Sequence, residues 1–303
     1  MKKFDHTSFY EEIARNKRKS YLLVSFFFVI LFILVFALAV IFTPFYAIFV
    51  LPIATLLIIL HIYRAYNYGD ASILKAVNAQ PADPVKHRYL IDTAEGLAIA
   101  AGIPAPKVYV MESEEINAFA TGKDPEHASI TFTTGALKNL KRDEIEGVMG
   151  HEISHIANYD VKYATLVVAL VGIIAIISYI FLRSLRHGSF GGGGGKKGGA
   201  IILVIIIAGV ILAVLAPIAT RIVQASISRK RELLADATGA KITRYPDGLA
   251  NALEKILKKN QGKMDVSEGM SHLFISDPTH SALDKVFATH PPLEERIKIL
   301  RSM

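Results

Sequence analysis

Five consecutive residues, His151-Glu152-Ile153-Ser154-His155, combine two histidines and a glutamate at a spacing suited to metal chemistry. On a helix, side chains four residues apart lie on one face, so both imidazole rings can reach a single Zn²⁺ ion. Glu152 lies between them, where it can act on an attacking water rather than bind the metal. The pattern predicts a zinc hydrolase with His151 and His155 as ligands and Glu152 as catalytic base. The alternative is a pair of packed or surface histidines.

A catalytic zinc site needs a third protein ligand and an open fourth position for water. The extended motif, with a third histidine soon after the first two, is absent from this chain. The best candidate is Glu232, and Asp236, one helical turn further on, could accept the second ring N–H of a ligand histidine. A solvated Glu232 paired with a neighbouring basic residue is an equally good interpretation of the residues alone.

Long stretches without any charged side chain flank these motifs, at Tyr21–Leu60, Tyr163–Leu182 and Ala200–Thr220. About 20 apolar helical residues cross the roughly 30 Å of a bilayer's hydrocarbon core. Prolines interrupt the first stretch, which is long enough for two helices. We therefore expect four transmembrane helices, spans one and two in 21–63 and spans three and four in 161–222. The glycine-rich loop 184–199 between the last two is interpreted as a flexible linker.

Basic residues beside the spans predict their orientation. They precede span one at Lys2, Lys3, Arg15, Lys17, Arg18 and Lys19, and follow span four at Arg221, Arg229, Lys230 and Arg231. By the positive-inside rule, both termini and the catalytic domain are cytoplasmic. The expected location is the inner (cytoplasmic) membrane, with the chain as a multi-pass protein. The loop between spans three and four is also basic, so either it is an exception or these two spans do not fully cross.

The polar segments must position the motifs. Apolar spacing predicts a mostly helical segment at Ala71–Gly102 and helices at Lys141–Asp160, Ser226–Lys241, Pro246–Lys259 and Pro292–Arg301. Turn and charged residues separate three short predicted strands, Lys107–Met111, Ile116–Thr121 and Ser129–Thr133. The expected fold class is an α+β membrane protein: four apolar transmembrane helices and a mainly helical, gluzincin-type zincin domain with a small β-sheet. After a basic tail at 1–20, the catalytic domain comes in two parts, 64–160 and 223–303.

Composition excludes several other classes of function. The chain has no cysteine, so it uses neither disulfides nor thiolates, and its net charge of +7 is better explained by membrane orientation than by nucleic acid, which is not an expected partner. Uncharged spans disfavour a transporter or channel, since ion pathways place ionisable groups inside the membrane. A zinc scaffold without turnover would have no use for Glu152.

Over nearly its whole length the chain resembles the HtpX-type membrane zinc endopeptidases, relatives of the CAAX prenyl proteases. The matching segments are Asn117–Gly122, His151–His155, Ser228–Asp236 and Thr289–Arg296. The resemblance implies one Zn²⁺ per chain, held by His151, His155 and Glu232, with Glu152 as the base and Asp236 bonded to a ligand. It also implies that Asn117, His290 and Arg296 contact substrate or the transition state.

Two further expectations concern the substrate. His290 is the first choice for the donor that stabilises the oxyanion, and Asn117 the second. The strand that carries Ala118 and Phe119 could pair an exposed edge with an extended peptide, although it could equally be an internal strand with Phe119 in the core. The resemblance implies quality control of damaged membrane proteins, so the expected partners are polypeptide substrates and the lipid bilayer. Whether copies of the chain form a homo-oligomer stays open.

Overall fold

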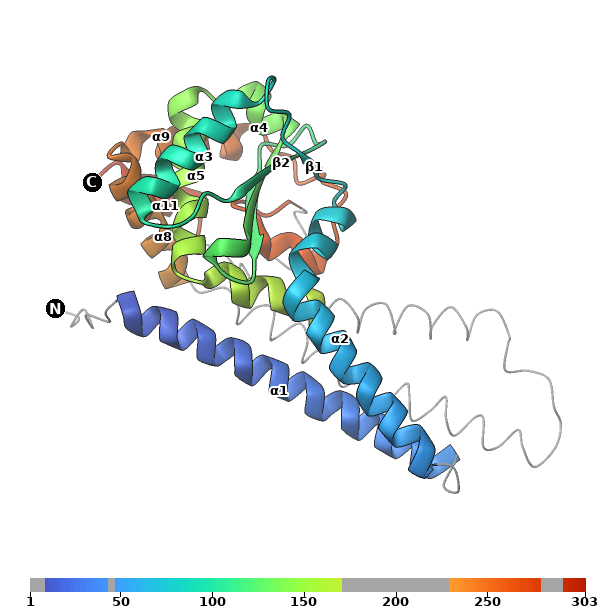
Figure 1. Cartoon of the computed structure of the whole chain (residues 1–303). Coiled ribbons are helices and arrows are strands. Elements are labelled where there is room, and N and C mark those ends of the chain that lie inside the picture. Colours follow the sequence, from blue (N-terminus) through green and yellow to red (C-terminus); the bar gives the residue numbers. More distant parts are fainter. Residues whose placement is uncertain (1–8, 43–46, 171–228, 279–290) are drawn as a thin grey trace.

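The computed structural model describes residues 9–42, 47–170, 229–278 and 291–303. Two long helices, α1 (Phe9–Phe42) and α2 (Ala47–Ala76), extend together from a domain built of a small sheet and shorter helices (Figure 1). The N-terminal end of α1 and the C-terminal end of α2 meet this domain, and their other ends lie far from it.

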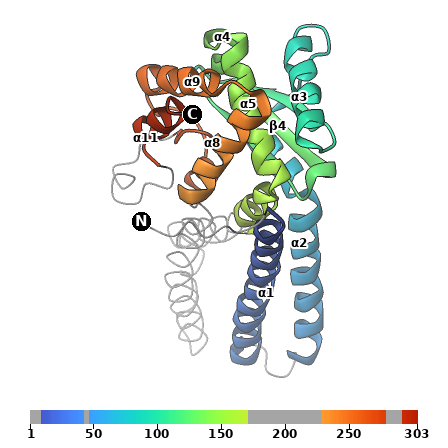
Figure 2. The same ribbon diagram turned by 90° about the vertical axis from the view of Figure 1, so that its left-hand side faces the viewer.

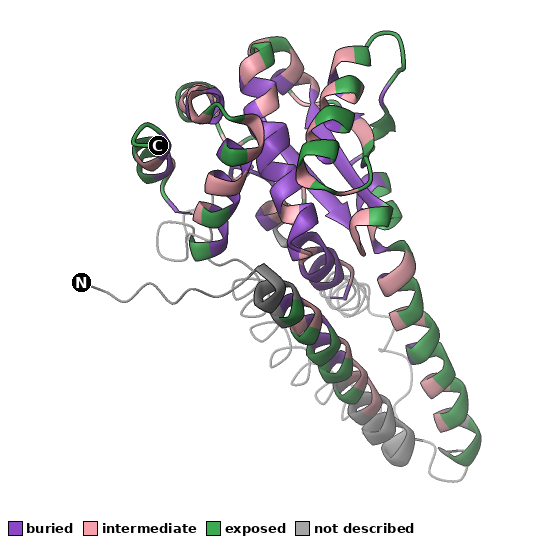
Figure 3. Ribbon diagram, turned by 60° about the vertical axis from the view of Figure 1, so that its left-hand side comes forward, coloured by how far each residue is buried: buried purple, intermediate pink, exposed green. Residues whose placement is uncertain are grey.

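Both long helices carry exposed large apolar side chains among their described residues (Figure 3). The exposed residues include Tyr21, Leu22, Phe26 and Val29 on α1, and Ile48, Phe49, Ile53, Leu56, Leu57, Ile59 and Leu60 on α2. Counting only the residues that the structure describes, no helix is long and apolar enough to cross a membrane. The four predicted spans are therefore not confirmed, and 171–222, which holds most of spans three and four and the loop 184–199, lies outside the described residues.

Four strands form one mixed sheet in the order β1-β2-β4-β3. They are β1 (Gln80–Pro81), β2 (Lys107–Met111), β3 (Ala118–Gly122) and β4 (Ala128–Thr133). Strands β2 and β4 run parallel, and β3 pairs antiparallel with β4 at one edge of the sheet. The three predicted strands are confirmed, with β3 beginning two residues later than expected. The two-residue β1 was missed because it is too short to show alternation.

Helices cover the sheet and complete the domain. They are α3 (Arg88–Ala101), α4 (Thr134–Asn139), α5 (Arg142–Ala157), α8 (Arg229–Thr243), α9 (Pro246–Lys259) and α11 (Leu293–Leu300). Helix α5 is central: α8, α9 and α11 lie on one side of it and α3 on the other (Figure 2). The prediction that Ala71–Gly102 is mostly helical is confirmed for the end of α2 and for α3, but β1 and a turn separate these two helices. Pro81 and Pro84 in this region cannot continue a helix.

The core of the domain lies between α5 and the sheet. The apolar face that the sequence predicted for α5 is buried there, with Val148, Met149 and Ile153 each at most 1% exposed. Phe132 and Ile130 of β4 join the same cluster from the sheet. Because this face fixes the rotation of α5 about its axis, the histidines of the motif point away from the core and toward α8.

Candidate metal centre

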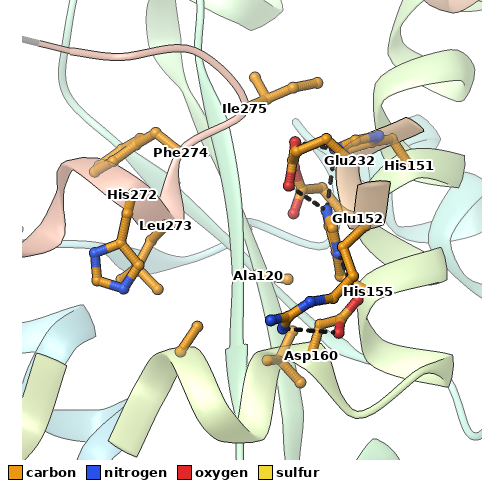
Figure 4. Close-up of a pocket in the computed structure, with 13 residues that line it drawn as sticks. Ala120, His151, Glu152, His155, Asp160, Glu232, His272, Leu273, Phe274 and Ile275 are labelled. Atoms are coloured by element: carbon orange, nitrogen blue, oxygen red, sulfur yellow. Dashed lines mark hydrogen bonds and ion pairs between the residues drawn. The ribbon is translucent and has the colours of Figure 1, made fainter. Parts of the chain in front are cut away.

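The two histidines of α5 and Glu232 of α8 converge on one point (Figure 4). The Nε2 atoms of His151 and His155 lie 3.2 Å apart. The Glu232 carboxylate lies 3.5 Å from His155 Nε2 and 3.7 Å from His151 Nε2. Two ligand atoms bound tetrahedrally at the usual Zn–N and Zn–O distances are separated by about 3.3 Å. The three donors therefore fit a single Zn²⁺ ion, and their chemistry suits a catalytic site with one open position.

Glu152 lies beside these three residues and is buried at 2% exposure. Burial and, to a lesser extent, the charge of Glu232 raise the pKa of its carboxyl, while His155, Arg296 and the Ala120 backbone N–H lower it, and the net pKa is about 7. A carboxyl group that titrates near neutral pH can both accept and return a proton during one turnover. The position and the pKa suit the general base that the sequence predicted.

Asp236 holds the ring of His151 from behind. Its Oδ1 atom lies 2.9 Å from His151 Nδ1, and both residues are 1% exposed. Burial on its own would raise the pKa of Asp236, but the charge and hydrogen bonds of Arg296 and His151 lower it to about 2. An ionised Asp236 keeps the ring proton on Nδ1, which leaves Nε2 free to face Glu232 and a metal. The structure thus places Asp236 where the sequence expected it.

A second carboxylate, Asp160, holds His155 in the same way. Asp160 Oδ2 lies 3.1 Å from His155 Nδ1, and Arg231 donates a 3.2 Å hydrogen bond to Asp160 Oδ1. Burial by itself lowers the pKa of His155, but the Asp160 hydrogen bond and the charges of Glu232 and Glu152 raise it to about 9. Each histidine of the motif is therefore backed by one aspartate and one arginine, as a His–Asp–Arg chain.

Asp160 and Arg231 were not predicted from the sequence as site residues. Asp160 begins the next helix after a turn at Tyr159, whose φ of +58° reverses the chain so that the aspartate can return to His155. A left-handed backbone at a tyrosine gives no sequence signal, since such conformations are uncommon outside glycine and asparagine. The one sequence feature that pointed to a role for Arg231 is its position directly before the candidate ligand Glu232.

Arg296 has partners other than the predicted substrate. The side chain is fully buried, donates two hydrogen bonds to Asp236 of 2.8 and 2.7 Å, and donates a third of 3.1 Å to the Ile275 carbonyl. It also lies 3.8 Å from the Glu232 carboxylate. These groups enclose the guanidinium, which holds Asp236 in place. Direct contact of Arg296 with substrate stays a prediction.

Asn117 is likewise engaged inside the protein. It is 1% exposed, donates a 2.8 Å hydrogen bond to the Ser276 carbonyl and accepts one of 3.3 Å from the Ser276 N–H. These bonds tie the start of β3 to the segment that follows η2 (Glu268–Leu273). Asn117 therefore acts as a clamp between two segments, and its contact with substrate stays a prediction.

The edge of β3 is covered by the chain itself. Ile275 N donates a 3.0 Å hydrogen bond to the Ala118 carbonyl, and Phe274 forms a bridge with Phe119, their ring centroids 4.8 Å apart. The predicted exposed edge at Ala118 and Phe119 is therefore not exposed, because Phe274 and Ile275 occupy it. The other interpretation, with Phe119 in the core, fits this structure.

A pocket opens beside the three candidate ligands His151, His155 and Glu232. Leu273 and Phe274 line its opposite wall (Figure 4). Its lining consists of Ala120, His151, Glu152, His155, Asp160, Val161, Ala164, Arg231, Glu232, His272, Leu273, Phe274 and Ile275. The predicted oxyanion donor His290 lies outside the described residues.

Comparisons with known proteins identify the family of this chain. The family model described as Peptidase family M48 matches residues 84–303. A "Protease HtpX homolog" of Caldanaerobacter subterraneus subsp. tengcongensis is 43% identical over 294 residues, which cover 97% of each chain. Another, of Streptococcus agalactiae serotype III, is 38% identical and covers 97% of this chain and 99% of its own. These similarities confirm the resemblance that the sequence segments indicated.

A solved structure extends the comparison to the fold. The crystal structure of S. mikatae Ste24p matches with a TM-score of 0.50 at 20% sequence identity, covering 89% of this chain. This chain spans 61% of the length of Ste24p. At this identity the likeness shows a shared fold alone.

Proposed function

We propose, from the premise that this chain belongs to peptidase family M48, that it is a membrane-held zinc endopeptidase of protein quality control. Family membership and the HtpX relatives make the chain a metallopeptidase. The observation that carries the zinc assignment is the convergence of His151, His155 and Glu232 at distances that suit one tetrahedral ion.

In the proposed mechanism, peptide hydrolysis by a zinc-activated water, each residue of the site has a separate role. Bound Zn²⁺ supplies a Lewis acid and a nucleophilic water at neutral pH. Glu152 accepts the proton of the attacking water and later passes it to the leaving amine. Asp236 and Asp160 keep the two imidazole rings in the orientation that presents Nε2 to the site. We assign the oxyanion donor to His290, because Asn117 is held by Ser276.

The substrates follow from the proposed attachment to a membrane. Exposed apolar side chains along α1 and α2 favour contact with lipid, because soluble surfaces rarely carry apolar patches of that extent. We therefore retain the four-span topology of the sequence analysis, with the catalytic domain on the cytoplasmic face. A site close to the bilayer meets misfolded membrane proteins and their unfolded loops.

Cleavage of unfolded casein by the full chain in detergent tests the enzymatic part. Activity should require zinc and should disappear in Glu152→Gln, while Glu95→Gln, an exposed carboxylate on α3, should behave as the wild type. If the wild type binds one zinc tightly but cleaves nothing, and Glu152→Gln behaves identically, a metal-binding scaffold replaces the peptidase.

Single cysteines test the topology cleanly, because the natural chain contains none. Ile99, which is 81% exposed on α3, is a suitable site in the catalytic domain. With that domain in the cytoplasm, a membrane-impermeant maleimide should label Ile99→Cys in inverted vesicles and in permeabilised cells. Labelling in intact spheroplasts would place the domain on the outer face and contradict the proposed orientation.

A further inference from the structure

Helix α1 reaches the metal centre through the side chain of Asn16. This residue lies in the basic N-terminal part of the chain but is only 1% exposed. Its Nδ2 group donates hydrogen bonds of 2.8 Å to Asp160 Oδ1 and of 3.0 Å to the Asn158 carbonyl. Asn16 therefore spans more than 140 positions in sequence to bind the turn that follows the His151–His155 motif.

Neighbouring contacts hold α1 in this place. The Lys17 Nζ atom lies 4.3 Å from the centre of the Tyr159 ring, which belongs to the same turn. Further along α1, Leu23 and Phe27 pack in a buried cluster with residues of the helical segment 160–170 and of α2. These contacts dock α1 independently of Asn16, so the amide is presented to Asp160 by an already anchored helix.

Asp160 connects Asn16 to the metal centre. Its Oδ2 atom holds His155 Nδ1, while its Oδ1 atom accepts hydrogen bonds from both Asn16 and Arg231. Arg231 approaches from α8, next to Glu232, and Asn16 approaches from α1. Two donors from different helices fix the rotation of the carboxylate, and the carboxylate in turn fixes the plane of the His155 ring. Removing one donor leaves Asp160 free to turn toward the other.

We propose that Asn16 is a positioning residue for His155, acting through Asp160, so that helix α1 forms part of the support of the metal centre. The inference rests on the zinc site of the proposed function. Groups that orient a metal-bound histidine typically change metal affinity by about 10- to 100-fold when they are removed. Because Arg231 remains, we expect Asn16→Ala to lie at the lower end of that range.

The test compares Asn16→Ala with a matched variant of the same helix, using the full chain in detergent. Ser20 is one turn away and equally buried, and its hydroxyl donates to the Asn16 backbone carbonyl without touching Asp160. Zinc affinity is measured by competition with a chelator. Asn16→Ala should bind zinc about tenfold more weakly than the wild type. Ser20→Ala should retain the wild-type affinity.

Two further measurements distinguish a role of Asn16 in positioning His155 from a general weakening of the packing of α1. The visible absorption of the Co²⁺-loaded protein reports ligand geometry, and Asn16→Ala should shift it while Ser20→Ala should not. In casein cleavage, Asn16→Ala should lower kcat and leave KM unchanged. Asn16→Asp, which keeps the size but replaces the donor by a carboxylate, should lose at least as much zinc affinity as Asn16→Ala.

The outcomes also distinguish this inference from the proposed function. If the wild type itself binds no zinc, the proposed metal site fails. If the wild type binds zinc and Asn16→Ala matches it within twofold, with the same Co²⁺ spectrum, the positioning role is overturned. Equal losses in Asn16→Ala and Ser20→Ala would also overturn it, because they would reflect weakened docking of α1.

Discussion

Gly239 of α8 lies against the backbone of His151 on α5: a Cβ atom on the glycine would come within 2.8 Å of the His151 nitrogen. Only a residue without a side chain allows the two helices to approach this closely. The approach sets the distance between the histidines of α5 and the carboxylates of α8. The spacing of the metal centre therefore depends on a residue that donates nothing to it.

Gly239→Ala should separate α5 from α8. Forcing a methyl group against rigid backbone costs about 1–3 kcal/mol of folding free energy, and the shift should also weaken zinc binding by moving Glu232 away from the rings. Thermal unfolding and chelator competition measure the two effects. Gly96→Ala is the matched control: its Cβ meets nothing within 4 Å on α3, so it should stabilise the protein slightly. A Gly239→Ala protein with wild-type zinc affinity would contradict the packing argument.

Arg296→Met should destabilise the protein because it leaves the buried carboxylate of Asp236 without its charged partner. Asp236, 1% exposed, would lose the two hydrogen bonds from Arg296. Breaking a buried ion pair from one side typically costs about 3–5 kcal/mol. The double variant Arg296→Met/Asp236→Asn removes the charge as well, so its loss of stability should be smaller than the sum of the two single losses. Strict additivity in this cycle would show that the pair is not coupled.

Glu152→Gln should change how stability of the metal-free protein depends on pH. The pKa of Glu152 rises from an ordinary value of 4.5 to about 7 on folding, so the folded state binds more protons between these values. The contribution of Glu152 to stability therefore falls as the pH rises through this window, by about 3 kcal/mol in total. Glutamine does not titrate. The variant should match the wild type near pH 4.5 and exceed its stability above pH 7.

Unfolding of the metal-free wild type and Glu152→Gln proteins at several pH values between 4.5 and 8 measures this difference. A stability gap that stays constant across the range would mean that the Glu152 carboxyl titrates at its ordinary pKa in the folded protein.

Phe274→Ala should open the covered edge of β3. The Phe274 ring packs on Phe119 and helps to hold the segment that occupies this edge. Loss of a buried phenylalanine costs about 3–5 kcal/mol, and a loosened segment should also lower KM for casein because an extended peptide can then pair with β3. Phe132→Ala on β4 is the control, since Phe132 is equally buried but lies in the core cluster of the sheet and α5. If both variants leave KM unchanged, the covered edge is not where substrate enters.

The sequence by itself determined the local features of the site. His151, Glu152 and His155 are brought together by one helical turn, and the apolar residues of the same helix decide which face is buried. The strands at Lys107–Met111 and Ser129–Thr133 were also predictable, because short runs bounded by turn and charged residues are a local pattern. Glu232 and Asp236 could be identified as candidates from the chain, with the resemblance deciding between ligand and surface residue.

Only the tertiary structure decided which partners these residues have. Asn16, Asp160 and Arg231 meet because three helices pack together, and no spacing in the sequence encodes that contact. The same packing buries Arg296 against Asp236 and places Phe274 on the edge of β3, which decided between the two interpretations of that strand. Periodicity specifies which face of an element is buried, but the side chain that meets that face depends on how separate elements pack, and that is a property of the whole fold.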